Sequence, residues 1–145
     1  LDGGWAFDEL SNSADASNGS PYFFTLTGDA YFRITDAFLS GDVFSVFNKE
    51  TLLVTTSFEA FPSAFGDQAN ADVAWTNGSF SGAEILLGAG DYELSVFYES
   101  GRDVFPTGFY TRLDSVAPVP LPAALPLMAG GLAALGVAAR RRRRA

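Results

Sequence analysis

The sequence of 145 residues predicts an all-β fold, an antiparallel β-sandwich of the jelly-roll or immunoglobulin-like type, followed by one C-terminal transmembrane helix. Short runs of alternating apolar and polar residues recur through residues 1–115, and Gly, Asn, Asp or Pro bounds each run, as is typical of strands joined by turns. An uncharged, apolar stretch follows at residues 116–139, and five consecutive arginines come after it. The sequence therefore divides into a domain at residues 1–115 and a C-terminal segment at residues 116–145.

Seven strands are predicted in the domain, which is enough for two packed antiparallel sheets. They are residues 22–27, 30–35, 43–47, 52–58, 84–87, 91–99 and 108–113. Because side chains alternate between the two faces of a strand, one face of each run is expected to be buried. The residues expected in the core include Phe44, Val46, Leu94 and Val96. Residues 60–82 have the least regular pattern and are predicted to form a long loop, with Trp75 as an internal anchor.

The composition excludes most kinds of catalytic site. The chain has no His and no Cys, so it has no Ser-His-Asp or Cys-His nucleophile, no zinc site with nitrogen or sulfur ligands, and no disulfide. With 17 acidic residues, some close pair of carboxylates is expected by chance, and nothing distinguishes an acid from a base among them. We therefore expect no enzymatic activity and no catalytic residue.

The charges are separated along the chain. Residues 1–115 contain all 17 acidic residues and only four basic ones (Arg33, Lys49, Arg102 and Arg112), which gives the domain a net charge of −13. The other five basic residues form the C-terminal cluster, Arg140, Arg141, Arg142, Arg143 and Arg144. A domain of this charge repels phosphate, so nucleic acid is not an expected partner.

The apolar stretch predicts a helix that spans a membrane. A helix over residues 122–139 has 18 residues and a length of about 27 Å, close to the ~30 Å hydrocarbon core of a bilayer. Proline is tolerated in the first turn of a helix, which supports a start at Pro122. By the positive-inside rule, the arginine cluster stays in the cytoplasm and the acidic domain lies on the other side of the membrane.

The C-terminal segment resembles a PEP-CTERM sorting signal of the VPLPA variant. Three parts occur in order: a proline-rich motif at residues 118–122, a short helix rich in Gly, Ala and Leu, and the arginine cluster. The residues of the sorting motif are Val119, Pro120, Leu121, Pro122 and Ala123. Leu121 stands where the commonest form of the family has Glu. The resemblance implies processing by an exosortase, a membrane-embedded, transpeptidase-like enzyme of bacteria that make extracellular polysaccharide.

Three acidic residues of the domain are candidate ligands for Ca²⁺. Asp29, Asp36 and Asp42 lie close together in the sequence around a predicted turn, and Ca²⁺ takes six to eight oxygen ligands. No EF-hand or repeated calcium motif is present. The alternative is that these side chains only form hydrogen bonds with the backbone of their own turns. No other cofactor is expected.

Four aromatic residues are candidates for stacking on sugar rings. They are Trp5, Trp75, Tyr31 and Tyr110. A β-sandwich suits a carbohydrate-binding module, and the alternative is ordinary packing of the same rings against their neighbours.

We expect, from these observations, a non-enzymatic exported protein that an exosortase sorts to the cell surface or to the extracellular polysaccharide. Its precursor belongs in a bacterial cell envelope and spans the inner membrane once, with the domain outside the cytoplasm. The chain starts at Leu1 without Met, so an export signal is expected to precede it. Two alternatives stay open: a surface module that binds glycan or Ca²⁺, and a periplasmic protein that its tail anchors permanently.

Overall fold

The computed structural model describes residues 1–36, 40–59 and 71–116. These residues form strands and one short helix. In chain order the elements are β1 (Ala6–Leu10), β2 (Tyr22–Leu26), β3 (Ala30–Asp36), β4 (Val43–Asn48), β5 (Thr51–Thr55), α1 (Ala71–Asn77), β6 (Gly82–Leu87), β7 (Gly90–Ser100) and β8 (Thr107–Ser115).

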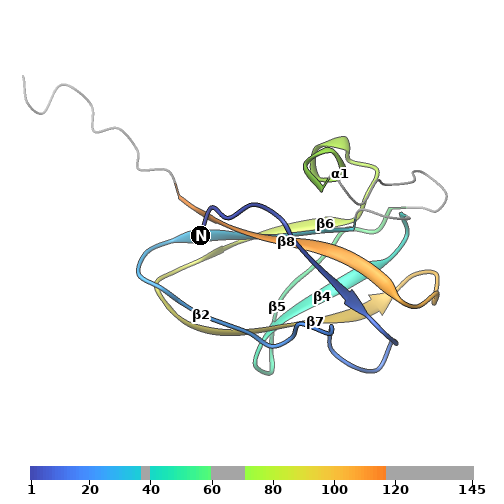
Figure 1. Cartoon of the computed structure of the whole chain (residues 1–145), viewed down its shortest axis with the longest axis horizontal. Coiled ribbons are helices and arrows are strands. Elements are labelled where there is room, and N and C mark those ends of the chain that lie inside the picture. Colours follow the sequence, from blue (N-terminus) through green and yellow to red (C-terminus); the bar gives the residue numbers. More distant parts are fainter. Residues whose placement is uncertain (37–39, 60–70, 117–145) are drawn as a thin grey trace, which may run out of the picture.

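The strands form two four-stranded antiparallel sheets that pack face to face (Figure 1). The order is β1-β8-β3-β6 in one sheet, here called the β8 sheet, and β2-β7-β4-β5 in the other, the β7 sheet. Among the described strands, the chain changes sheet at every connection except that from β4 to β5. Eight strands connected in this order form a jelly roll. The predicted antiparallel sandwich is therefore confirmed.

The core lies between the sheets and is built from inward-facing residues of both. In β3, Ala30, Phe32 and Ile34 are buried, as the alternation predicts. The four residues expected in the core, Phe44, Val46, Leu94 and Val96, are all fully buried. Phe44 of the β7 sheet meets Phe109 of the β8 sheet with 5.2 Å between the ring centroids. This contact joins the two sheets near the end of the sandwich where β4 and β8 begin.

The sequence pattern does not predict β1 or α1. In β1 only Leu10 is buried, and the adjacent acids Asp8 and Glu9 interrupt the alternation of apolar residues. The prediction of a loop over residues 60–82 is wrong for the seven residues of α1, a helix too short to show a clear period of 3.6 residues. Residues 60–70 lie outside the described residues.

The two ends of the sandwich differ. The register places the short turns, residues 27–29, 49–50 and 88–89, towards one end, and the long connections after β1, β3, β5 and β7 at the other. The N-terminus and the end of β8 lie side by side at the short-turn end (Figure 1).

Asp2 holds the N-terminal segment against the end of β8. Its backbone N–H donates to the Leu113 carbonyl (2.8 Å), and its carboxylate accepts hydrogen bonds from the backbone N–H and the hydroxyl of Ser115 (both 2.9 Å). The hydrogen bonds from Ser115 lower the pKa of Asp2. The backbone of Asp2 has a positive φ of 59°, which is uncommon for residues other than Gly and Asn.

The substitution Phe44→Ala tests the contact between the sheets. It removes a fully buried ring, and we expect the free energy of unfolding to fall by about 3–5 kcal/mol. Leu86→Ala is the matched control, because Leu86 lies on the outer face of β6 and is 52% exposed. It should change that free energy by less than about 0.5 kcal/mol. Urea unfolding of the full chain measures both values, and equal losses in the two variants would contradict the proposed role of Phe44.

Candidate functional site

The four candidate aromatic residues meet on the outer face of the β8 sheet. Tyr31 lies on β3, Tyr110 on β8, Trp75 on α1, and Trp5 directly before β1. The rings of Trp5 and Trp75 lie 5.8 Å apart between centroids, and Tyr110 packs against Phe7 at 5.6 Å. The structure therefore brings together residues that are up to 105 positions apart in the sequence.

Two arginines on the same face lie against these rings. The guanidinium carbon of Arg33 lies 5.6 Å from the centroid of the Tyr31 ring and 5.7 Å from that of Trp75. The guanidinium carbon of Arg112 lies 5.5 Å from the centroid of the Trp5 ring. A cation over the face of an aromatic ring is attracted by the negative charge of that face. These contacts attach α1 and the N-terminal segment to the sheet.

Each of the two arginines forms ion pairs with two carboxylates. Asp114 accepts from Arg33 at 2.5 Å and from Arg112 at 2.6 Å. Glu84 binds Arg33 at 2.6 Å, and Asp72 of α1 binds Arg112 at 3.2 Å. The hydrogen bonds with Asp114 raise the pKa of Arg112 further above its usual value.

The cluster over the β8 sheet is thus a set of mutually satisfied groups. Trp75 also covers Gly82, where an added Cβ would lie 3.3 Å from the indole ring. The four aromatic side chains are only partly exposed, and a sugar ring would have to displace an arginine or another ring to stack on them. This geometry favours the packing alternative for these four residues and confirms Trp75 as an internal anchor.

The three candidate calcium ligands do not share one site. Asp29 precedes β3 and Asp36 ends it, so the length of the strand, at about 3.3 Å per residue, separates them by roughly 20 Å. Asp36 and Asp42 are both buried at the long-loop end, whereas Asp29 is exposed at the other end. Within residues 1–36, 40–59 and 71–116, no group of three acidic side chains is placed to hold a metal ion. Calcium binding at Asp36 and Asp42 stays a prediction.

Asp42 forms hydrogen bonds that hold the connections together at the long-loop end. Its carboxylate accepts hydrogen bonds from the Thr107 hydroxyl (2.5 Å) and the Arg102 backbone N–H (3.1 Å), and its carbonyl accepts one from the Ser81 hydroxyl (2.5 Å). Gly101 passes so close that an added Cβ would lie 2.5 Å from the Asp42 carboxylate. Asp42 therefore connects the loops before β4, β6 and β8.

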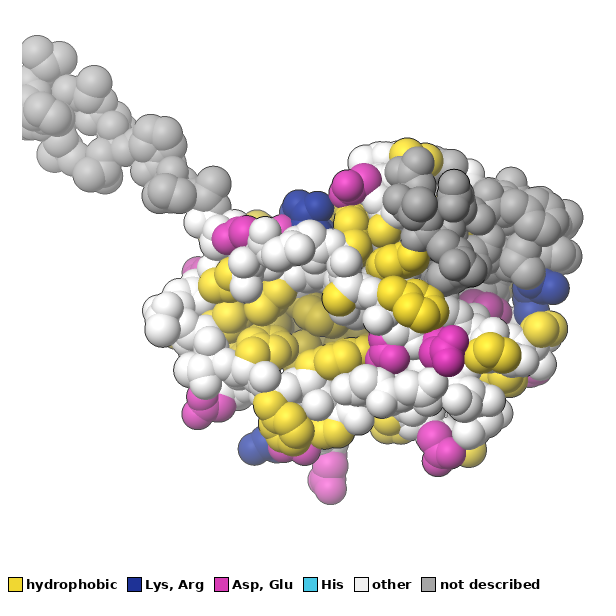
Figure 2. Space-filling model, viewed as in Figure 1, with side chains coloured by type: hydrophobic (Ala, Val, Ile, Leu, Met, Phe, Trp, Pro, Cys, Tyr) yellow, Lys and Arg dark blue, Asp and Glu magenta, His cyan; other side chains and the backbone are white. Residues whose placement is uncertain are grey.

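A second polar cluster joins the edge strands β1 and β2. The Tyr22 hydroxyl donates a hydrogen bond to the Asp8 carboxylate, which also accepts one from the Gly19 N–H at 3.0 Å. Beside this cluster, a hollow of about 250 Å³ opens between the two sheets, and Figure 2 shows hydrophobic side chains at its floor. Burial, and then the neighbouring Asp8, raises the pKa of Tyr22 well above its usual value of 10.

The C-terminal signal is not among the described residues. The sorting motif, the predicted helix at residues 122–139 and the arginine cluster all lie beyond residue 116. In the part of the chain that the structure describes, no helix has the length and apolar character needed to cross a bilayer. No protein-family model matches the chain, and no curated protein is similar to it.

The sequence pattern did not predict the polar residues that connect the cluster over the β8 sheet, or those that connect the cluster between β1 and β2. Arg33 and Arg112 are two of only four basic residues in the domain, and both occupy outward positions of predicted strands. That scarcity was a usable signal, because a basic residue in an acidic domain is expected to attract carboxylates. The pairing of Asp8 with Tyr22 had no signal, because β1 itself was not predicted.

Tyr22→Phe tests the cluster between β1 and β2 through alkaline unfolding. The folded state raises the pKa of Tyr22, so its contribution to stability is complete below the unfolded value of about 10 and is lost as the pH rises above it. We expect the stability of the unaltered chain to fall from about pH 9 to pH 12 more steeply than that of Tyr22→Phe. Urea unfolding across this range measures both slopes, and identical slopes would show that Tyr22 does not titrate in this way.

Proposed function

We propose that this chain is a non-enzymatic, exported bacterial protein whose C-terminal segment is a sorting signal for an exosortase. The observation that carries the proposal is the order of three features at the end of the sequence: a proline-rich motif at residues 118–122, an apolar stretch, and the five arginines. Each feature is weak alone, but together they match one kind of signal.

The fold supports a tail that is separable from the domain. Among the described residues, the buried core cluster runs from Leu10 to Phe109. The strand β8 ends at Ser115, which is exposed and lies at the surface beside Asp2. Cleavage beyond residue 116 would therefore leave every member of this cluster in the domain.

The proposed signal works through the physical properties of its parts. The prolines favour an extended backbone in the motif, and an extended segment is the conformation that a protease cleft usually binds. The apolar stretch holds the motif at the outer edge of the inner membrane, and the arginines keep the end of the chain in the cytoplasm. Processing then delivers the acidic domain to the cell surface or the surrounding polysaccharide.

The intact mass of the mature protein, purified from its native host, tests the proposal. We expect a mass that lacks the five C-terminal arginines. As a matched comparison, a variant with all five arginines replaced by Gln should stay unprocessed, because its orientation signal is gone. If every mature molecule keeps Arg140 to Arg144, the chain is instead the permanently anchored periplasmic protein.

A binding module stays the second candidate. Its glycan form gains support from the outer face of the β7 sheet, which differs in chemistry from the face that α1 covers. Its calcium form rests on Asp36 and Asp42 alone. A rise in the melting temperature of the full chain with added Ca²⁺, lost in Asp42→Asn while the variant stays folded, would favour the calcium form.

A further inference from the structure

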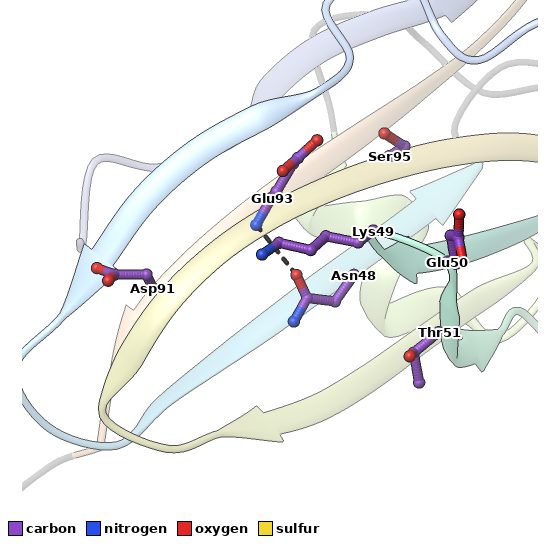
Figure 3. A pocket seen from close by; sticks show the side chains of 7 residues that line it. All are labelled: Asn48, Lys49, Glu50, Thr51, Asp91, Glu93 and Ser95. Carbon is purple, nitrogen blue, oxygen red and sulfur yellow. Dashed lines mark hydrogen bonds between the residues drawn. The ribbon is translucent and has the colours of Figure 1, made fainter.

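A polar hollow lies on the outer face of the β7 sheet (Figure 3). It has a volume of about 750 Å³ and lies between the outward side chains of β7 and the turn that joins β4 to β5. Asp91, Glu93 and Ser95 line it from β7, and residues 48–51 line it from the turn. Every residue of this lining is polar, unlike the hydrophobic floor of the hollow between the sheets.

The frame of the hollow is fixed by hydrogen bonds. The side-chain oxygen of Asn48 accepts a hydrogen bond from the backbone N–H of Glu93 (3.1 Å). The backbone N–H of Lys49 donates to the Glu93 carbonyl (2.9 Å). Figure 3 shows the Lys49 side chain extending beside Asn48 along β7. These bonds connect the turn to the neighbouring strand and hold the lining residues in one arrangement.

Three of the four charged side chains of the hollow have no partner in the described part of the chain, and the fourth, Asp91, accepts a hydrogen bond from the Thr25 hydroxyl at 2.7 Å. Within the described residues, the side chains of Lys49, Glu50 and Glu93 make no hydrogen bond and no ion pair. The opposite holds over the β8 sheet, where Arg33 and Arg112 each bind two carboxylates. The hollow therefore presents one ammonium donor and two carboxylate acceptors whose hydrogen-bonding capacity is open to a ligand.

The backbone of the turn has an uncommon conformation at Lys49, the residue whose ammonium group lies at the hollow. Lys49 has a φ of 55°, in the left-handed region where Gly or Asn costs less. The side chain gains no partner in the described part of the chain that would offset this cost. The backbone of Lys49 takes part in the frame of the hollow, whereas its side chain remains open to a ligand.

Apolar side chains border the polar groups on both sides. Phe23 of β2 is paired with Glu93 in the sheet and is 71% exposed. On the other side, Phe47 is paired with Ser95 and packs edge-on against Phe97, with 5.6 Å between ring centroids. Leu52 continues this row on β5 and is 52% exposed. The face thus alternates apolar surface with hydrogen-bonding groups.

We propose that this face of the β7 sheet binds an uncharged polysaccharide built from hexoses. A pyranose ring has apolar C–H faces that pack on aromatic rings and a rim of hydroxyls that donate to carboxylates and accept from an ammonium group. The hollow holds Glu50, Asp91 and Glu93 against Lys49 alone, in a domain of net charge −13, so an anionic polymer would be repelled. The site does not depend on the fate of the tail, so it goes beyond the sorting function.

Isothermal titration calorimetry on the full chain tests this binding. The chain is kept in lauryldimethylamine oxide, a detergent without a sugar headgroup that would compete for the site. The probes are maltopentaose, cellopentaose and laminaripentaose as uncharged oligosaccharides, with a galacturonate oligomer as the anionic comparison. We expect saturable binding of at least one uncharged probe and none of the galacturonate oligomer.

Single substitutions then locate the site. Phe23→Ala and Glu93→Gln should each weaken binding by about tenfold, because one removes an apolar platform and the other a charged acceptor. Leu86→Ala, at an exposed apolar position on the other sheet, should leave affinity unchanged. Far-UV circular dichroism confirms that each variant is folded.

Three outcomes would overturn the proposal. The first is that no uncharged probe binds, and the second is that the galacturonate oligomer binds best. The third is that Trp5→Phe, which alters the cluster over the β8 sheet, abolishes binding while Phe23→Ala does not. None of these results bears on the mass of the mature protein, so the failure of this proposal is distinguishable from the failure of the sorting proposal.

Discussion

The contact between Phe44 and Phe109 is the interaction on which the rest of the sandwich depends. Each ring comes from the inward face of a different sheet, and both are fully buried. Because a strand directs successive side chains to opposite faces, fixing these two inward also fixes which residues point outward. The rows that carry Arg33 and Arg112 on one sheet, and Glu93 and Phe23 on the other, follow from that single choice of register.

The two outer faces use their polar residues in different ways. Over the β8 sheet, aromatic rings, arginines and carboxylates satisfy one another and attach the helix α1. In the hollow on the β7 sheet, the side chains of Lys49, Glu50 and Glu93 have a fixed frame but open hydrogen-bonding capacity within the described residues. Satisfied networks rigidify a fold, whereas fixed and unsatisfied polar groups at a surface are suited to recognition.

The sequence predicted the strands whose apolar residues alternate without interruption. The alternation in β3 and β7 was recognisable because Arg33 separates Phe32 from Ile34 and Ser95 separates Leu94 from Val96. β1 was not, because a single buried Leu10 carries no period. The candidate sites were harder to predict. Proximity in the sequence suggested Asp29 beside Asp36, but an extended strand separates them, and the hollow near Glu93 arises only from strand pairing between distant segments.

The strand that leads into the C-terminal segment has a particular position in its sheet. β8 lies between β1, which pairs with residues 107–111, and β3, which pairs with residues 109–115, and Asp2 adds two hydrogen bonds at Ser115. In an antiparallel ladder these bonds run perpendicular to the strand. Tension applied through residue 116 along the strand direction therefore loads these bonds in shear, and does not open them one at a time. Of the strands in this sheet, the one that leads into the C-terminal segment is well placed to carry mechanical force from that segment into the domain.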